Sequence, residues 1–188
     1  AAAARQLASD PKQRAENLMI VDLIRNDLSR VAQAGSVKVP DLFRVESFPT
    51  IHQLVSDVTA SLPKNIGAVD VLRAAFPCGS ITGAPKIRAM EILEQCEAEE
   101  RGLYTGSIGF IEPNGDAAFN VAIRTLVFPN LTCDKYGAAC ASMGLGSGIV
   151  ADSRPDEEWR ECLAKGNFVT AASETFDLLE TLAFDPVE

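Results

Sequence analysis

Two glutamates and one lysine near the end of the chain have a spacing that suits metal or carboxylate chemistry. Glu158 precedes Glu161 by three residues, and Lys165 follows Glu161 by four. On an α-helix these side chains share one face. Two carboxylates on one face can ligate Mg²⁺ and leave coordination positions for water and substrate oxygens. A solvated helix face with an ordinary i,i+4 ion pair has the same spacing, so both interpretations stand at this point.

A third carboxylate, Glu16, lies beside an apolar stripe that includes Leu18 and Met19. Projecting from a helix into a cleft, it could complete a metal site, and the alternative is an ordinary surface residue. His52 is the only histidine, which argues against a His-rich zinc site and for a hard ion held by carboxylates. The His52 ring is either a satisfied strand side chain or a catalyst.

Two glycine-rich segments, at residues 79–86 and 144–148, could present backbone N–H groups to an anion. In the first, three residues separate Gly79 from Gly83 and a proline precedes Lys86. This departs from the phosphate-binding P-loop, so nucleotide binding is not expected. The first segment is either a carboxylate site at a helix start or a tight turn that needs glycine. The second is either an anion site or a flexible strand connection.

Arg124 lies in an apolar segment that we expect to be a strand, between Ile123 and Thr125. An arginine inside such a strand needs a partner, because an unpaired buried charge is costly. That partner is either a substrate carboxylate bound by the guanidinium fork or a structural aspartate or glutamate.

Helices are expected on both sides of these segments. Asp10 and Pro11 provide a capping side chain and a proline at the first helical position, and Gly35 ends the helix that follows. Ser153 is expected to cap the last helix, with Asp156 at the reciprocal capping position. The expected helices lie at residues 12–31, 70–76 and 86–99, and from about residue 155.

Strands are expected between the helices, and the turn at Asn114 and Gly115 is a strong hairpin signal. The mixture of hairpins and helices predicts an α+β fold rather than alternating βαβ units. The expected strands lie at residues 37–62 with breaks at Pro40 and Pro49, at 106–111, at 117–128 and at 136–143.

Composition narrows the function classes. The 188 residues carry a net charge of −9, from 17 basic and 26 acidic side chains, which argues against general nucleic-acid binding. No apolar run reaches the roughly 18 residues of a membrane span, so no membrane partner is expected. The five cysteines form no C-x-x-C pair, which favours reduced thiols and a cytoplasmic protein.

Together these segments resemble the chorismate-utilising enzymes, a family that includes anthranilate, aminodeoxychorismate, isochorismate and salicylate synthases. The resemblance covers residues 10–168 and implies a chorismate-binding catalytic domain over residues 1–172. It also implies the C-terminal half of the family fold, an α+β arrangement of antiparallel or mixed β-sheets with helices on the outside. The matching motifs lie at residues 14–28, 76–90, 104–109, 123–125 and 146–153, followed by Glu158, Glu161 and Lys165.

The resemblance implies chorismate as the substrate, Mg²⁺ as the cofactor, and a role for each candidate residue. Glu16 and Glu161 would be Mg²⁺ ligands, with Glu158 close to the ion. Ser80 and Thr82 would border the pocket, with Thr82 among the catalytic residues. The enolpyruvyl carboxylate would be bound by Arg124, Tyr104 and the backbone of Gly146, Ser147 and Gly148, and Lys165 would hold a carboxylate.

The catalytic assignment of His52 rests on a weaker match. Many family members place a histidine directly before Leu-Val-Ser, whereas Gln53 holds that position here. Strand side chains alternate faces, so the one-residue offset points the ring the other way unless a bulge intervenes.

Within the family, residues 76–86 are more similar to aminodeoxychorismate synthases than to anthranilate synthases, which usually have Gly-Thr-Leu-Ser-Gly there. This implies amination of chorismate in para-aminobenzoate and folate synthesis, with ammonia from a separate glutamine amidotransferase subunit. The alternatives are an anthranilate synthase component or a non-catalytic chorismate-binding fragment.

Both ends of the chain bear on this expectation. Residues 174–181 resemble the junction to a fused aminodeoxychorismate lyase, so residues 173–188 are expected to be a linker or the start of that domain. The aminodeoxychorismate branch also carries a Pro-Ile-Lys-Gly-Thr motif upstream, whose lysine attacks the ring. The 188 residues do not include it, so we expect this fragment to be inactive alone.

Overall fold

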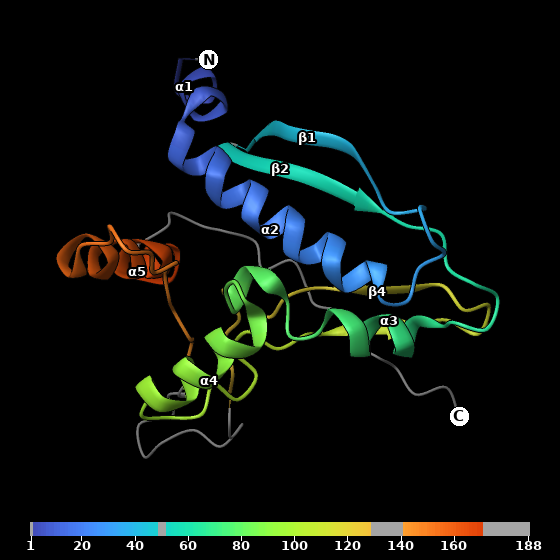
Figure 1. The fold of residues 1–188 in the computed structure, drawn as a ribbon. Helices are drawn as coiled ribbons and strands as arrows, with labels where there is room; N and C mark the ends of the chain where they lie inside the picture. Colours follow the sequence, from blue (N-terminus) through green and yellow to red (C-terminus); the bar gives the residue numbers. More distant parts are fainter. Residues whose placement is uncertain (1, 49–51, 129–140, 171–188) are drawn as a thin grey trace.

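The computed structural model describes residues 2–48, 52–128 and 141–170. It has the predicted α+β architecture, built of helices and two small antiparallel sheets (Figure 1). The helices are α1 (Ala2–Ser9), α2 (Pro11–Ser29), α3 (Ala68–Ala75), α4 (Lys86–Cys96) and α5 (Pro155–Thr170), with a 3-10 turn η1 (Gly79–Ile81). The strands are β1 (Lys38–Ser47), β2 (His52–Thr59), β3 (Gly109–Ile111) and β4 (Ala117–Phe119).

The start of α2 confirms the predicted cap. The Asp10 carboxylate accepts hydrogen bonds from the backbone N–H groups of Lys12 at 2.9 Å and Gln13 at 3.0 Å. These bonds satisfy two of the N–H groups that have no partner in the first helical turn. The helix ends at Ser29, slightly before the predicted end, and Gly35 then has a positive φ of 73°.

The antiparallel hairpin of β1 and β2 lies along α2, with α3 on the other side of that helix (Figure 1). The Asn17 side chain on α2 holds the hairpin, because it donates to the Leu54 carbonyl at 3.2 Å and accepts from Ser56 Oγ at 2.6 Å. The predicted strand break at Pro40 is wrong, since β1 runs through it. The pairing register shifts between Lys38 and Asp41, and sheets tolerate proline at such irregularities.

The second hairpin is shorter than predicted. Asn114 and Gly115 form its turn, and Gly115 has a φ of 95°, which a residue without Cβ adopts readily. The predicted strand 117–128 is wrong beyond Phe119, because the following residues pair with an irregular segment instead. Thr105 N–H donates to Ala122 O and Ala122 N–H donates to Gly106 O, both at 2.9 Å. The predicted strand 136–143 lies mostly outside the described residues.

The buried apolar core of the described residues is small. It consists of Val21, Ala74 and Ala122, and many larger apolar side chains are exposed, Ile87 at 75% and Trp159 at 65% among them. No helix in the described part of the chain is both long enough and apolar enough to cross a membrane. The predicted linker at 173–188 lies outside the described residues.

Candidate functional site

Tyr104 packs directly against the second glycine-rich segment. A Cβ at Gly144 would lie 2.2 Å from Tyr104 Cγ, and a Cβ at Gly146 would lie 2.5 Å from the Tyr104 hydroxyl oxygen. Only glycine therefore allows this close approach. Burial raises the pKa of the Tyr104 hydroxyl, and the nearby charges of Arg101 and Lys165 act in the opposite direction.

Lys165 on α5 completes this cluster. Its Nζ donates to the Gly146 carbonyl at 2.9 Å and lies 2.7 Å from Glu161 Oε1. Three residues predicted to bind substrate, Tyr104, Gly146 and Lys165, are thus brought together from distant parts of the sequence. The contact between Lys165 and Glu161 is the i,i+4 ion pair that was one of the two interpretations of their spacing in the sequence.

Glu158 lies one turn before Glu161 on α5, and its carboxylate accepts hydrogen bonds from hydroxyl groups. The pKa of its carboxyl is lowered, first by a hydrogen bond from Ser153 at 2.7 Å and then by one from Ser147. The positive charges of Lys12 and Lys165 contribute in the same direction. The contact with Ser147 links the glycine-rich segment to α5 a second time.

The predicted Ser153 cap with Asp156 is wrong. The Ser153 hydroxyl donates to Glu158 and accepts from the Val150 N–H at 3.1 Å. Two N–H groups in the first turn of α5, those of Glu157 and Glu158, donate to the Arg154 carbonyl at 3.0 Å instead. Ser153 is therefore used to fix the Glu158 carboxylate rather than to cap the helix.

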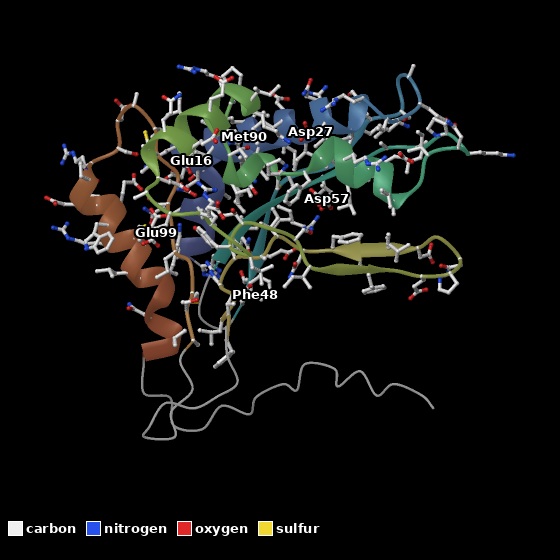
Figure 2. All side chains as sticks on the ribbon, turned by 90° about the horizontal axis from the view of Figure 1, so that it is seen from below. Glu16, Asp27, Phe48, Asp57, Met90 and Glu99 are labelled. Atoms are coloured by element: carbon white, nitrogen blue, oxygen red, sulfur yellow. The ribbon has the colours of Figure 1, made fainter. Side chains whose placement is uncertain are left out.

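The three predicted metal ligands come from two helices. Glu16 is 3.9 Å from Lys12, and it lies on the part of α2 nearer to α5 (Figure 2). The described residues include no group of three or more His, Cys, Asp or Glu side chains placed to hold a metal ion. Carboxylate oxygens are the donors that Mg²⁺ prefers, but here Glu16, Glu158 and Glu161 each contact a protein partner. The donor chemistry fits Mg²⁺, and the carboxylates are not gathered around one point.

The first glycine-rich segment is a tight turn packed on α2. A Cβ at Gly79 would lie 2.8 Å from Leu23 Cβ, so the turn needs glycine there. Thr82 Oγ1 donates within the turn to the carbonyls of Cys78 at 3.3 Å and Gly79 at 3.4 Å. Ser80 is exposed, and its hydroxyl lies 3.2 Å from Cys78 Sγ.

Three predicted site residues lie outside the cluster around Tyr104. Within the described residues, no hydrogen bond connects this cluster to Arg124, His52 or Gly148. The prediction that Arg124 lies inside a strand is wrong: it follows β4, is exposed and has a positive φ of 51°. Exposure removes the need for a buried partner, and Arg124 forms no ion pair with a described residue. Gly148 is exposed, and a Cβ added there would meet open space.

His52 is also exposed, at the start of β2. Its Nδ1 lies 2.9 Å from Ser47 Oγ, and the two residues are paired across the hairpin. The next pair, Glu46 with Gln53, continues the register without a shift. The irregularities of this hairpin lie farther along, on either side of Asp41, so no bulge turns the ring to the other face.

Arg101 was not expected from the sequence, although it contacts two predicted segments. Its guanidinium binds both oxygens of Glu97, at 2.8 Å and 2.6 Å, which lowers the Glu97 pKa. It also donates to the Ile81 carbonyl at 3.1 Å and to Thr105 Oγ1 at 3.3 Å, and lies 6.0 Å from the centre of the Tyr104 ring. The only sequence signal for this contact was the i,i+4 spacing of Glu97 and Arg101. Both residues lie beyond the end of α4, so helix periodicity did not predict the pair.

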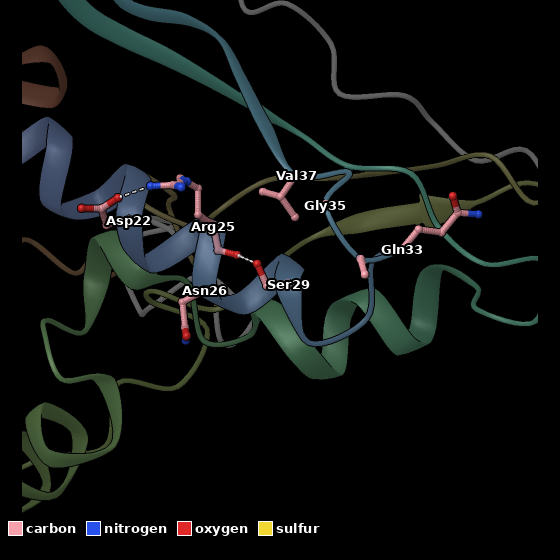
Figure 3. A pocket seen from close by; sticks show the side chains of 8 residues that line it. Asp22, Arg25, Asn26, Ser29, Gln33, Gly35 and Val37 are labelled. Atoms are coloured by element: carbon pink, nitrogen blue, oxygen red, sulfur yellow. Dashed lines mark hydrogen bonds and ion pairs between the residues drawn. The ribbon is translucent and has the colours of Figure 1, made fainter.

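A pocket of about 530 Å³ lies elsewhere, at the C-terminal half of α2 (Figure 3). At its edge Arg25 pairs with Asp22 at 2.8 Å, and Ser29 donates to the Arg25 carbonyl at 2.6 Å. The pocket contains no predicted site residue. It is lined by Asp22, Arg25, Asn26, Ser29, Gln33, Ala34, Gly35 and Val37.

The sequence pattern of the chorismate binding enzymes matches the chain over residues 1–171. The chain belongs to this family. The curated relatives of this chorismate binding enzyme agree with that result. Aminodeoxychorismate synthase component 1 of Klebsiella aerogenes is 52% identical over 163 residues, which are 87% of this chain and 34% of the relative. Anthranilate synthase component 1 of Aquifex aeolicus is 46% identical over 168 residues, 89% of this chain and 32% of the relative.

A solved structure shows the same family fold. The crystal structure of anthranilate synthase component I from Streptococcus pneumoniae aligns with a TM-score of 0.76 and 36% identity, covering 90% of this chain and 37% of that protein. The chain spans about a third of the length of the curated relatives it matches. The comparisons thus establish the family and the fold of this chain, and the activity of the whole protein is a separate inference.

Proposed function

We propose that this chain is part of an enzyme that converts chorismate and ammonia to 4-amino-4-deoxychorismate for para-aminobenzoate synthesis. The observation that carries the proposal is the convergence of Tyr104, Gly146 and Lys165. A phenol and an ammonium meet there beside glycine backbone, which suits a small carboxylated substrate. The relatives named aminodeoxychorismate synthase component 1, at 51–53% identity, support amination as the reaction.

In this proposal the charged groups of the cluster bind and orient chorismate. Lys165 would donate to a substrate carboxylate with its third N–H, since Glu161 and the Gly146 carbonyl engage two of the three donors of the ammonium. The Tyr104 hydroxyl, whose pKa is raised by burial, would act as a hydrogen-bond donor. Ser80 and Thr82 would border the bound substrate, and exposed Arg124, which forms no ion pair with a described residue, would bind the second carboxylate.

Mg²⁺ is part of the proposal as the cofactor. Glu16, Glu158 and Glu161 would hold it, as carboxylates on α2 and α5 that supply the hard oxygen donors the ion needs. The three are not gathered around one point in the described part of the structure, so they would have to move together to do so. Bound Mg²⁺ would supply a positive centre for a substrate carboxylate. Hydrogen bonds from Ser153 and Ser147 lower the pKa of Glu158 and so favour its ionised form, which is the form that a metal ion binds.

The proposed activity belongs to a longer catalytic unit that works with a partner. Large apolar side chains on three elements are exposed, Ile87 on α4, Phe110 on β3 and Trp159 on α5 among them. Such surfaces are typical of faces that other parts of a protein cover. Ammonia would come from a glutamine amidotransferase subunit, as the term component 1 in the relatives' names suggests. We place the protein in the cytoplasm, where the free thiols of Cys78, Cys96 and Cys162 would stay reduced.

The test uses the full-length protein that carries this chain, with chorismate, ammonium and Mg²⁺. We expect chorismate consumption and formation of aminodeoxychorismate, detected as para-aminobenzoate after addition of a lyase. Lys165→Met should raise the KM for chorismate by about tenfold or more, the cost of one charged hydrogen bond. Lys64→Met, at an exposed lysine in the loop before α3, is the control.

Anthranilate synthase is the second candidate, because the Aquifex aeolicus enzyme of that name is 46% identical. Anthranilate is fluorescent, so the same assay separates the two products. Anthranilate as the only product would replace the first proposal with the second. Failure to consume or bind chorismate would remove both.

A further inference from the structure

The Arg101 guanidinium joins two segments that carry the predicted substrate contacts, and we propose that it is a positioning residue for the chorismate site. Through it, the turn at residues 79–82 is held in a fixed position relative to Tyr104. The inference rests on the proposed function, because the site it organises is the one assigned to chorismate.

The two sides of the guanidinium have different partners. Nε and Nη2 bind the Glu97 carboxylate at 2.8 Å and 2.6 Å, a bidentate pair that fixes the plane of the group. Nη1 then points away from Glu97, toward the Ile81 carbonyl at 3.1 Å and Thr105 Oγ1 at 3.3 Å. Glu97 therefore orients Arg101, and Arg101 holds the turn.

The two contacts of Nη1 lie next to residues with proposed roles. Ile81 stands between Ser80 and Thr82, so its carbonyl belongs to the backbone that carries both hydroxyl groups. Thr105 follows Tyr104 and is 9% exposed, and its N–H donates to the carbonyl of fully buried Ala122 at 2.9 Å. Thr105 is thus the fixed end of the link, and the turn is the end that it positions.

The ion pair of Arg88 and Glu91 is an exposed pair with which the pair of Arg101 and Glu97 can be compared. Arg88 on α4 lies 2.7 Å from Glu91, with side chains 62% and 52% exposed. The Arg101 side chain is 27% exposed and contacts two further groups beyond its carboxylate partner. Lysine cannot replace arginine at Arg101, because a single ammonium cannot bind a carboxylate bidentately and also reach a carbonyl on the opposite side.

The experiment compares Arg101→Lys with Arg88→Lys in the full-length protein. We expect Arg101→Lys to raise the KM for chorismate about tenfold with kcat changed less than about twofold, since binding in the ground state and in the transition state is weakened alike. Amide hydrogen exchange in residues 79–82 should become faster, while exchange in α4 stays as in the wild type. Arg88→Lys should change neither quantity.

A second pair of variants separates positioning from a general loss of stability. Glu97→Gln keeps Arg101 but removes the charge that orients it, so it should change KM and exchange in the same direction by a smaller factor. In the Arg101→Lys protein, Thr82→Ala should add little to the effect on KM, because the turn is already displaced. Full multiplication of the two single effects would mean that Arg101 does not act through the turn.

The outcomes distinguish the two proposals. If wild-type protein neither binds nor consumes chorismate, the proposed function fails and this inference fails with it. If the wild type is active and Arg101→Lys leaves either KM or exchange in the turn unchanged, only the positioning role is overturned. A raised KM together with faster exchange confined to the turn supports both.

Discussion

Lys86, the first residue of α4, forms an ion pair with the buried carboxylate of Asp27, near the end of α2. Nζ lies 2.5 Å from Asp27 Oδ2 and also donates to the Ala75 carbonyl at 3.1 Å. The two side chains are only 16% and 5% exposed. The pair therefore joins α2, the end of α3 and the start of α4 around the η1 turn, and Asp27 is seen on α2 in Figure 2.

Removing Lys86 should destabilise the protein strongly. In Lys86→Ala the Asp27 carboxylate keeps its burial and loses its cation, which costs about 3 kcal/mol of unfolding free energy. Urea unfolding of the full-length protein, followed by circular dichroism, measures the change. Lys12→Ala is the control, because its contact with Glu16 is 3.9 Å long and its side chain is 65% exposed, so we expect at most about 0.5 kcal/mol.

The paired substitution of Asp27 and Lys86 by leucine tests the cause of that loss. Because no unpaired buried charge remains, the double variant should be more stable than Lys86→Ala. Equal losses in the two proteins would mean that the unpaired charge of Asp27 is not the cause of the loss in Lys86→Ala.

Alanine at Gly144 should be poorly tolerated, and alanine at Gly148 should be neutral. A Cβ at Gly144 would overlap the Tyr104 ring, at 2.2 Å from Cγ, whereas nothing lies within 4 Å of one at Gly148. Forcing an extra methyl group against a packed ring typically costs about 1–3 kcal/mol. Thermal unfolding of the two variants measures the difference, and similar melting temperatures would contradict the packing of Tyr104 on this segment.

Local signals in the sequence predicted much of the fold. The Asp10 cap and the Asn114–Gly115 turn are set by neighbouring residues, and both appear as expected. The failures come from longer-range pairing. Apolar residues after Phe119 suggested a long strand, but backbone partners at Thr105 and Gly106 hold Ala122 in an irregular segment.

The candidate site was predicted as separate motifs, and the structure shows which of them meet. The sequence could not show that Tyr104 packs on Gly144 and Gly146, because that contact depends on tertiary placement. Arg101 was missed for the same reason: its contact with Ile81 spans 20 residues and no helix periodicity connects the two. The roles of the three carboxylates in metal binding stay predictions.

Acid titration should report the hydrogen bond between Ser153 and Glu158. The pKa of Glu158 is lowered in the folded protein, so this group contributes stability above the unfolded pKa, and the contribution is lost as pH falls through the folded value. Ser153→Ala should raise the Glu158 pKa toward its ordinary value, and Ser153→Thr should retain the low one. NMR titration of the Glu158 carboxyl carbon measures both, and an unchanged pKa in Ser153→Ala would show that Ser153 is not the main cause.

Chelation of divalent cations should abolish the proposed activity, and added Mg²⁺ should restore it. Glu161→Gln should raise the Mg²⁺ concentration for half-maximal activity by about tenfold or more, because an amide oxygen carries no charge for the ion. Glu157→Gln is the matched control on the same helix, since Glu157 is 61% exposed and lies 3.5 Å from Arg154. Chorismate turnover in a series of Mg²⁺ concentrations gives both values. Equal Mg²⁺ requirements in the two variants would exclude Glu161 as a ligand and would leave its carboxylate only the ion pair with Lys165, at 2.7 Å.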